Sequence, residues 1–490
     1  MIRAQAKRLA AASVLSLFVA CARPPTPIDP IAPIVAIDLA PRCLEVQDLP
    51  PLSEGVRANE PAVLAERTTL PGGDSALWID TDAASPFARV AIGVPWPRDE
   101  ADDAAIAGLL LSEGWTARDP EGFRARAARH GAQVRVDTTG DRLWLAASAP
   151  TTEAAVLTDL LDEVVAFASV DEEAFAHARR RARLARLAVA ALPATVARDR
   201  LDRLRNDPAK GTAKPPRDRA ALRATLRTRF VEAPDRTLVF QGFAKDRIAA
   251  LGEWTRDRAA PAPDRADPAE SVARESEGAL DLAPTDVLVV DRRGAPQVEI
   301  LLAIPNAAGG RDDAPLLEAL ASVVGGNVGG RLFADLRERQ GLVYTIDAAQ
   351  DPDGLFVVST RARAPRVPAV VAGVEAHLRA LVEVPFLDCE AATLAQRMRG
   401  EDLLERADAD ARYAALRARL SRRRGSAGAD LSAHPIESIT SEALRAVARR
   451  HLNEAPIVVL VGDADAIDRA FEIVAPERRL RAIDEEGRID

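Results

Sequence analysis

Arg337 and Tyr344 are the residues of this chain whose chemistry can be named from their type and spacing. A guanidinium presents a fixed fork of N–H donors and a phenol presents one O–H donor, so the two together suit the carbonyl oxygens of a peptide backbone. Neither group needs to change its ionisation to hold such a ligand. The pair predicts a peptide-binding site; the alternative is a solvated helix arginine beside a half-buried strand tyrosine.

The segment that positions this pair, residues 325–346, has the pattern of a glycine turn, a helix and a strand. Its early glycines permit backbone conformations and close approaches that a Cβ would block. Apolar residues from Leu332 to Leu336 predict a helix, and Gly341 predicts its C-cap. The β-branched and aromatic residues from Val343 to Ile346 predict a strand, so the arginine and the tyrosine are expected to converge where helix and strand meet.

The chain also contains an internal repeat with a spacing of about 210 residues. Residues 90–111 read like residues 301–320, because in each copy an alternating strand leads through a Pro/Gly turn to an acidic helix start and an apolar helix. Strand-like segments at 236–243 and 456–463 match loosely at the ends of the copies. Two copies predict two similar domains.

The stretch GGRLFADLRERQGLVY, residues 329–344, resembles the pitrilysin/insulinase-type metallopeptidase family, whose second domain carries a Gly-rich SRLFxxLRExxGLxY motif. The resemblance implies an α+β fold of two tandem homologous domains, each a mixed, mostly antiparallel sheet packed with helices, as in mitochondrial processing peptidases. It also implies that Arg337 and Tyr344 bind the substrate peptide.

Active members of that family carry HxxEH on a helix of the first domain, where two histidines bind zinc and the glutamate activates the attacking water. The corresponding positions here are Ala105, Gly108 and Leu109, and the third ligand falls at Ala185 or Arg186. None of these residues can serve as a zinc ligand. The resemblance therefore implies that this chain holds no metal and that zinc belongs to a partner subunit.

The histidines of the chain offer no obvious replacement. No two of them stand four residues apart with a glutamate between them, and a zinc site needs three converging protein ligands. Single histidines are expected at the surface or at helix caps. His177, close to Glu172 and Glu173, is the least implausible candidate for a metal ligand. The sequence also lacks a GxSxG elbow and a Walker-type loop, so an active hydrolase with unusual ligands is the least favoured reading.

The acidic pairs Asp102-Asp103 and Asp312-Asp313 occupy equivalent places in the two copies of the repeat. They could be imagined as acid/base groups, but both pairs stand at expected helix starts. Carboxylates at such positions commonly cap the helix and favour the positive end of its dipole. Helix capping is therefore the predicted role.

Length and composition agree with two large domains. At 490 residues and 48% hydrophobic content, the chain can bury a sizeable core. Residues 256–282 crowd Pro, Ala and charges together without apolar periodicity, which predicts an exposed linker. It would separate an N-terminal peptidase-like domain at 53–255, with a degenerate zinc site, from a C-terminal one at 283–490.

The N-terminus has the features of a secretory signal. Basic residues precede an apolar run at 9–20 that is too short to span a bilayer, which predicts a signal peptide at 1–20. The following Cys21 resembles a bacterial lipoprotein site, with residues 21–52 as a lipidated, Pro-rich tether; an ordinary signal peptide cleaved nearby is the alternative. Because no aspartate follows Cys21, we expect attachment to the outer membrane, facing the periplasm.

In that oxidising compartment Cys43 and Cys389 could form a disulfide, which the sequence leaves open. The whole chain carries a net charge of −9, and removing Arg3, Lys7 and Arg8 with the signal leaves 62 basic against 74 acidic residues, or −12. A nucleic-acid partner is therefore excluded.

These observations predict a catalytically silent homologue that binds peptide and completes the chamber of an HxxEH-bearing partner subunit. The alternative from a different class is a non-proteolytic scaffold or binding lipoprotein of the cell envelope. The neighbouring genes would discriminate the two hypotheses, because a nearby gene for an HxxEH-bearing relative favours the two-component peptidase.

Overall fold

The computed structural model describes residues 33, 37, 66–69, 76–80, 85–139, 141–165, 170–205, 214–232, 236–243, 282–306, 313–325, 329–351, 354–421, 439–484 and 488–489. The predicted signal peptide 1–20, Cys21 and Cys43 lie outside these residues, as do nearly all of the tether and of the linker 256–282. No helix in the described part of the chain has the length and hydropathy needed to cross a membrane.

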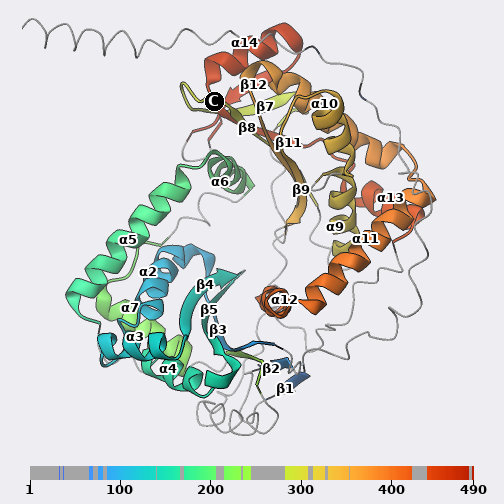
Figure 1. Cartoon of the computed structure of the whole chain (residues 1–490). Coiled ribbons are helices and arrows are strands. Elements are labelled where there is room, and N and C mark those ends of the chain that lie inside the picture. The colour runs from blue at the N-terminus through green and yellow to red at the C-terminus, as the bar shows by residue number, and fades with distance from the viewer. Residues whose placement is uncertain are drawn as a thin grey trace, which may run out of the picture.

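The first half of the chain forms a six-stranded sheet with the order β1-β2-β6-β3-β5-β4 (Figure 1). Its neighbours pair antiparallel except for β2 with β6. The strands are β1 (Glu66–Thr69), β2 (Ala76–Asp80), β3 (Phe87–Pro95), β4 (Gln133–Thr139), β5 (Arg142–Pro150) and β6 (Thr237–Gln241). The helices are α2 (Ala101–Ser112), α3 (Pro120–Arg129), α4 (Val156–Val165), α5 (Glu172–Ala190), α6 (Pro193–Arg205) and α7 (Arg219–Arg227), with short turns η2 (Arg98–Glu100), η3 (Thr151–Glu153) and η4 (Thr228–Glu232).

The second half forms a sheet of the same size with the order β12-β7-β11-β8-β10-β9. Here β7 pairs parallel with β11 and β12, and the other pairs are antiparallel. The strands are β7 (Asp286–Asp291), β8 (Val298–Pro305), β9 (Ile346–Asp351), β10 (Leu355–Ala362), β11 (Ile457–Gly462) and β12 (Arg479–Ala482). The helices are α9 (Ala314–Val324), η5 (Phe333–Arg339), α10 (Val367–Glu383), α11 (Asp388–Ala407), α12 (Ala409–Ser421), α13 (Ser441–His451) and α14 (Ala464–Val474), with a short turn η6 (Ala364–Arg366).

The two sheets confirm the internal repeat and the α+β fold class. The strands β2, β6, β3, β5 and β4 take the same successive places in the first sheet as β7, β11, β8, β10 and β9 in the second. The repeated segments at 90–111 and 301–320 correspond to β3 with α2 and to β8 with α9. Side chains that alternate along β3 and β8 fill a core under the helices of the same half.

The opposite face of each sheet is covered by a helix from the other half of the chain. Ala197 and Leu201 of α6 pack on β8 and β11, whereas Tyr413 and Leu416 of α12 pack on Trp144 and its neighbours in the first sheet. Figure 1 shows α6 beside the second sheet and α12 beside the first. The halves that the sequence divides at 256–282 thus exchange a helix, and this contact buries apolar surface on both sides.

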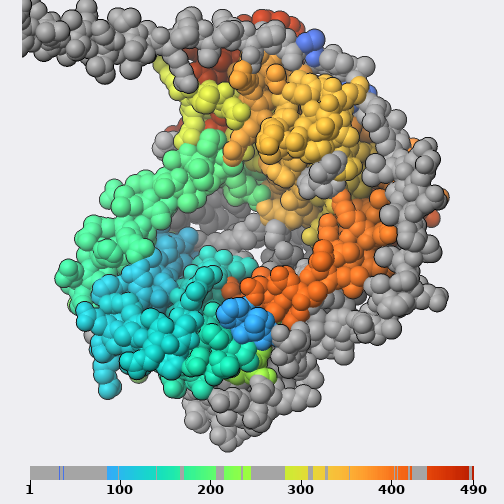
Figure 2. Space-filling model, in the orientation of Figure 1, coloured from blue at the N-terminus to red at the C-terminus, as the bar shows by residue number. Residues whose placement is uncertain are grey.

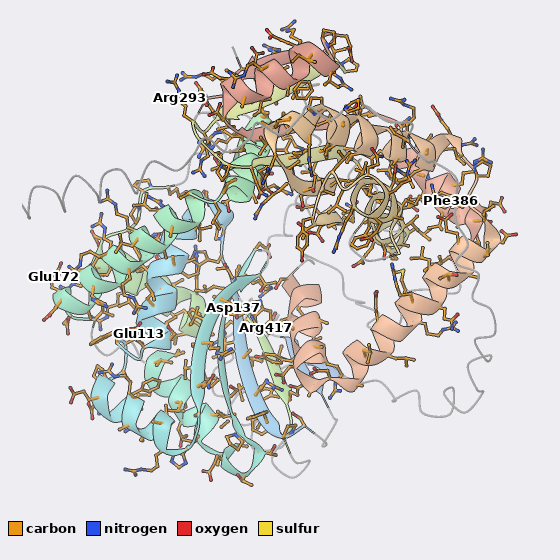
Figure 3. The ribbon with its side chains drawn as sticks, turned by 45° about the horizontal axis from the view of Figure 1, so that its top comes forward. Glu113, Asp137, Glu172, Arg293, Phe386 and Arg417 are labelled. Carbon is orange, nitrogen blue, oxygen red and sulfur yellow. The ribbon has the colours of Figure 1, made fainter. Side chains whose placement is uncertain are left out.

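Polar contacts fix both exchanged helices. The Trp144 Nε1 donates to Ser421 Oγ at 2.9 Å, and Arg417 of α12 pairs with Asp137 of β4, as Figure 3 shows. On the other side Arg198 of α6 pairs with Asp351 at the end of β9. Apolar contacts therefore hold each exchanged helix on its sheet, and ion pairs or hydrogen bonds fix its position along the sheet.

The acidic pairs do not cap their helices as predicted. Asp102 and Asp103 lie in the first turn of α2 without a capping hydrogen bond; Asp102 pairs with Arg186, and Asp103 accepts a hydrogen bond from the Arg217 backbone N–H at 2.8 Å. Asp313 precedes α9, also without capping it, and Asp312 lies outside the described residues. Arginines that reach in from neighbouring segments supply stronger, charged donors than the helix backbone, so these acids join separate segments of the chain instead.

Candidate functional site

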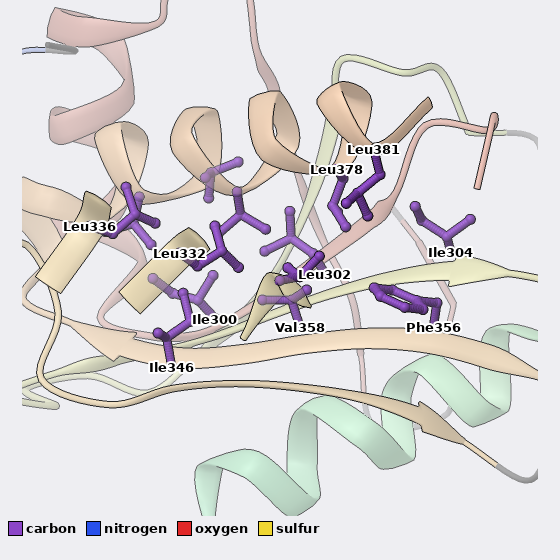
Figure 4. Packing of buried hydrophobic residues seen from close by; sticks show 14 of the residues in the cluster. Ile300, Leu302, Ile304, Leu332, Leu336, Ile346, Phe356, Val358, Leu378 and Leu381 are labelled. Carbon is purple, nitrogen blue, oxygen red and sulfur yellow. The ribbon is translucent and has the colours of Figure 1, made fainter. Parts of the chain in front are cut away.

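Arg337 lies on the helix η5, whose apolar face packs into the core of the second half. Leu332 and Leu336 are fully buried and point with Ile346 into the core beneath α10 (Figure 4). Gly373 of α10 makes this approach possible, because a Cβ there would lie 2.5 Å from a Leu336 methyl carbon. The close packing fixes the position of η5, and with it the side of the helix on which Arg337 stands.

The predicted helix is present but has π-helical geometry over Phe333–Arg339. Gln340 N–H donates to the Asp335 carbonyl at 3.0 Å, five residues back. The predicted C-cap is confirmed: Gly341 has φ +62°, and its N–H donates to the Arg337 carbonyl at 3.0 Å. A left-handed conformation at this position favours glycine.

The predicted strand at 343–346 begins only at its last residue, since β9 starts at Ile346 and Tyr344 lies in a bend. The chain needs these residues to turn from the helix end to the sheet: Leu342 N–H still donates to the Leu336 carbonyl at 2.8 Å, and the Val343 side chain is buried in the core. Burial of Val343 on one side leaves Tyr344 facing solvent.

The structure brings Arg337 and Tyr344 together, as predicted. The Arg337 guanidinium carbon lies 4.8 Å from the centre of the Tyr344 ring and 4.4 Å from the centre of the Phe333 ring. Both distances are in the range of cation–π contacts. Tyr344 is 77% exposed, and the Arg337 side chain is 33% exposed, with its Nε at 3.4 Å from a Glu338 carboxylate oxygen. The pair is an ordered donor surface that remains open to solvent.

A buried Asp–His pair beneath the site was missed by sequence reasoning. Asp335 accepts hydrogen bonds from His377 Nε2 at 2.8 Å, from Gln340 at 2.9 Å and from Arg339 at 2.8 Å. Burial alone would raise the pKa of Asp335, but these donors outweigh it and hold the pKa below its usual value. The available signal was His377 itself, an imidazole between the apolar residues Ala376 and Leu378 of α10.

Burial lowers the pKa of His377, and the neighbouring Asp335 only partly opposes this effect. The imidazole is therefore neutral at pH 7 and donates its Nε2–H to an ionised carboxylate. The start of η5 is fixed as well, because Arg331 forms a two-pronged contact with Glu390 of α11 at 2.8 and 2.7 Å. These buried contacts hold the backbone on both sides of Arg337.

The helix α2 shows what replaces the zinc site of active relatives. Ala105 is exposed and Gly108 and Leu109 are half-buried, so the positions of the motif lie on the least buried face of α2. On the facing helix α5, Arg186 pairs with Asp102 of α2. Arg186 is one of the two positions, with Ala185, at which the third ligand was expected, and its guanidinium repels a cation instead of binding one.

Four of the five histidines lie in the described part of the chain. His377 and His451 are buried and bonded to Asp335 and Asp313, so they are core residues and not the surface or cap residues expected. His130 lies 2.7 Å from Glu153, His177 is exposed, and His434 lies outside the described residues. No group of three His, Cys, Asp or Glu among the described residues could hold a metal ion.

The comparisons with known proteins agree with this geometry. Residues 268–387 match the family model described as the peptidase M16 inactive domain. The structure is similar to that of a peptidase M16 inactive domain from Pseudomonas fluorescens, with a TM-score of 0.66 and 14% identity over 82% of this chain and 98% of that one. No curated protein matches the sequence significantly.

Two larger proteases share the fold over part of their length. The periplasmic protease PqqL from Escherichia coli gives a TM-score of 0.59 at 12% identity, covering 82% of this chain and 46% of that one. A mutant of the ferredoxin protease FusC, in complex with Arabidopsis ferredoxin, gives 0.57 at 14%, covering 88% and 47%. The chain thus spans about half the length of these two proteases.

The fold is that of the M16 peptidases, and the segment carrying Arg337 falls within the model of their inactive domain. The match of residues 268–387 to the inactive-domain model supports a catalytically silent homologue of the pitrilysin/insulinase-type peptidases. The chain holds no catalytic zinc, because the three positions of the motif on α2 carry no ligand.

A direct consequence concerns metal content. Purified alone, the mature chain is expected to bind no stoichiometric zinc, since Ala105, Gly108 and Leu109 provide no donor and Arg186 opposes a cation. Elemental analysis after mild chelation checks this. One tightly held zinc per chain would contradict the prediction and would favour a hydrolase with unusual ligands.

Proposed function

We propose that this chain binds peptide substrates through Arg337 and Tyr344 and completes the chamber of a zinc-bearing partner subunit. The observation that carries the proposal is the stack of the two side chains, which is built by buried contacts of η5 and yet remains exposed. An arginine with only a structural role would be expected to bury its donors on protein acceptors. Among the described residues, Arg337 instead forms an ion-pair contact with its chain neighbour Glu338 at 3.4 Å.

The chemistry of the pair fits a peptide backbone. Stacking between Phe333 and Tyr344 orients the guanidinium plane, so less freedom is lost when its N–H groups bind carbonyl oxygens. The Tyr344 hydroxyl adds a neutral donor nearby. The pair thus offers hydrogen-bond donors, which suit binding of a peptide backbone.

The sheets offer a second element of peptide recognition. The outer strands β4 and β9 each pair with one neighbour among the described strands, and Figure 1 shows them on the sides of their halves that face each other. An edge strand has backbone donors and acceptors available to an extended peptide. Figure 2 shows a hollow between the halves, with α5 and α6 along one border and α11 and α12 along another.

Peptide cleavage would need chemistry from another chain, because α2 has lost its zinc ligands. The FusC complex shows a protease of similar fold together with a protein substrate, which supports a protein or peptide as the ligand here. To test the function, the chain is mixed with an HxxEH-bearing M16 relative taken from the same genome. Peptide cleavage that requires both proteins is expected; a partner that cleaves equally well alone would favour the scaffold alternative.

We also place the protein in the bacterial cell envelope, anchored by lipid on Cys21. Cys389 is a disulfide cysteine, and the chain has three cysteines in all. A disulfide fits the oxidising periplasm. A lipidated Cys21 has no free thiol, so the proposal also assigns Cys43 as the partner of Cys389.

The anchor has a simple test. The wild-type protein is expected to partition with membranes and Cys21→Ala to remain soluble or unprocessed, because the acyl chains of a lipoprotein bury enough CH₂ groups for stable anchoring. Fractionation of cells expressing each form provides the measurement. Equal soluble fractions for both would refute the lipid anchor.

A further inference from the structure

The side chains in the second half of α5 are exposed, although Arg186 still pairs with Asp102 of α2. The first half buries an apolar face against the body of the protein, with Ala174, Phe175, Ala178 and Ala182. In contrast, every residue from 183 to 192 is exposed. Four of these are large and apolar, with exposed fractions of 65% for Leu184, 52% for Leu187, 52% for Val189 and 54% for Leu192. Such a concentration of exposed apolar side chains marks an interaction surface.

The apolar side chains lie on more than one side of the helix. By helical spacing, Leu184 and Leu187 stand three residues apart on the face opposite the buried residues of the first half. Val189 falls on the side of the buried residues, beyond the Arg186–Asp102 contact with α2, and Leu192 follows the helix end at Ala190. A flat membrane surface reaches only one side of a helix, so a protein surface that wraps around this segment fits better.

The charges along α5 define the kind of protein that would fit. No Asp or Glu occurs from 174 to 198, although five arginines do between 179 and 186. Arg181 pairs with Glu113 and Arg186 with Asp102, both of α2. Arg179, Arg180 and Arg183 are exposed, and no ion pair with them is present among the described residues. On a chain with a net charge of −9, this cationic surface calls for an acidic complement.

We propose that residues 179–192, the second half of α5 and the two residues after it, are the docking surface for the zinc-bearing partner subunit, through a partner surface that is apolar at its centre and acidic at its rim. This rests on the proposed function, which requires such a subunit. The α5 helix packs on α2 and borders the hollow (Figure 2). A partner seated there would bring its zinc to the side where this chain has lost its own ligands. A second copy of this chain fits poorly, because its arginines would face each other.

The test uses the full mature chain and the same HxxEH-bearing relative, with affinity measured by calorimetry. The double variants Leu184→Ser with Leu187→Ser, and Arg180→Glu with Arg183→Glu, are expected to weaken binding by about a hundredfold each, as for central interface residues. The side chains are exposed, so thermal stability should not change. Ile473→Ser on α14 and Arg129→Glu on α3 change equally exposed residues away from α5 and should bind like wild type.

The outcomes separate the docking surface from the function itself. If the wild-type pair binds and both double variants bind equally well, the docking surface is wrong and the two-component function stands. If wild type does not bind the HxxEH relative at all, the proposed function fails and the docking surface fails with it. The double variants could keep their affinity for the partner and instead lose binding to phosphatidylglycerol vesicles, which would assign the surface to a membrane. They could likewise lose self-association in sedimentation, which would assign it to a second copy of the chain. Either result would overturn the proposal.

Discussion

Replacement of Arg337 by alanine is expected to lower the kcat/KM of the reconstituted pair by about tenfold to a hundredfold, because a charge-assisted hydrogen bond to the peptide contributes about 1.5–3 kcal/mol. Tyr344→Phe removes one neutral donor, worth about 0.5–1.5 kcal/mol, and keeps the ring that stacks on Arg337. The arginine variant should therefore be the more damaging one. Initial rates at low peptide concentration give the comparison.

Several controls separate binding from folding. Arg337 also stacks on Phe333, so its loss could loosen η5, and each variant must be compared at matched thermal stability. Arg379→Ala removes an exposed arginine from α10 and should leave cleavage unchanged. Arg337→Lys keeps the charge without the planar fork, so it should rescue only part of the activity. Normal folding with wild-type cleavage in both Arg337→Ala and Tyr344→Phe would leave the scaffold function as the better account.

Local signals were enough to predict the arrangement around this pair. Gly341 adopts the left-handed conformation expected of a C-cap, and the period from Leu332 to Leu336 places both leucines in the core. Residues of the opposite side of the helix, including Arg337, then face outward. The repeat likewise predicted equivalent strands, although β3 and β8 are buried on both faces and not only at alternate residues.

Features that depend on distant parts of the chain were not predictable in the same way. The π-helical geometry of η5 and the late start of β9 follow from how the segment packs beneath α10, where Gly373 leaves room for Leu336. The buried partner of Asp335 lies 42 positions away in His377. Likewise, nothing in the local pattern of α6 or α12 shows that each covers the sheet of the opposite half.

The position of the silent helix α2 depends on a buried carboxylate at its start. Glu100 is 4% exposed and accepts hydrogen bonds from Arg217 at 2.8 Å and from Arg229 at 2.7 Å. The Arg229 guanidinium carbon also lies 4.3 Å from the centre of the Trp96 ring. The hydrogen bond from Arg217 has the largest effect on the pKa of Glu100 and lowers it. Burial raises this pKa, and the contact with Arg229 lowers it further. Together these effects lower the pKa from 4.5 to about 2. The network joins α2 to the segment around α7 and η4.

Glu100→Gln is therefore expected to lower the free energy of unfolding by about 3 kcal/mol at pH 7, from 1.36 kcal/mol for each pKa unit of the shift. The folded-state pKa lies below the unfolded one, so this contribution is complete above pH 4.5 and is lost as the pH falls toward about 2. Urea unfolding of both forms at pH 7 and at successive values down to pH 3 should show the difference shrink by about half or more. Glu232→Gln is the matched control, because that carboxylate pairs with Arg227 at an exposed site and should cost under about 1 kcal/mol. A difference between wild type and Glu100→Gln that stays constant with pH would show that the buried ionised carboxylate does not stabilise α2, and that the packing of Trp96 and Arg229 holds the helix instead.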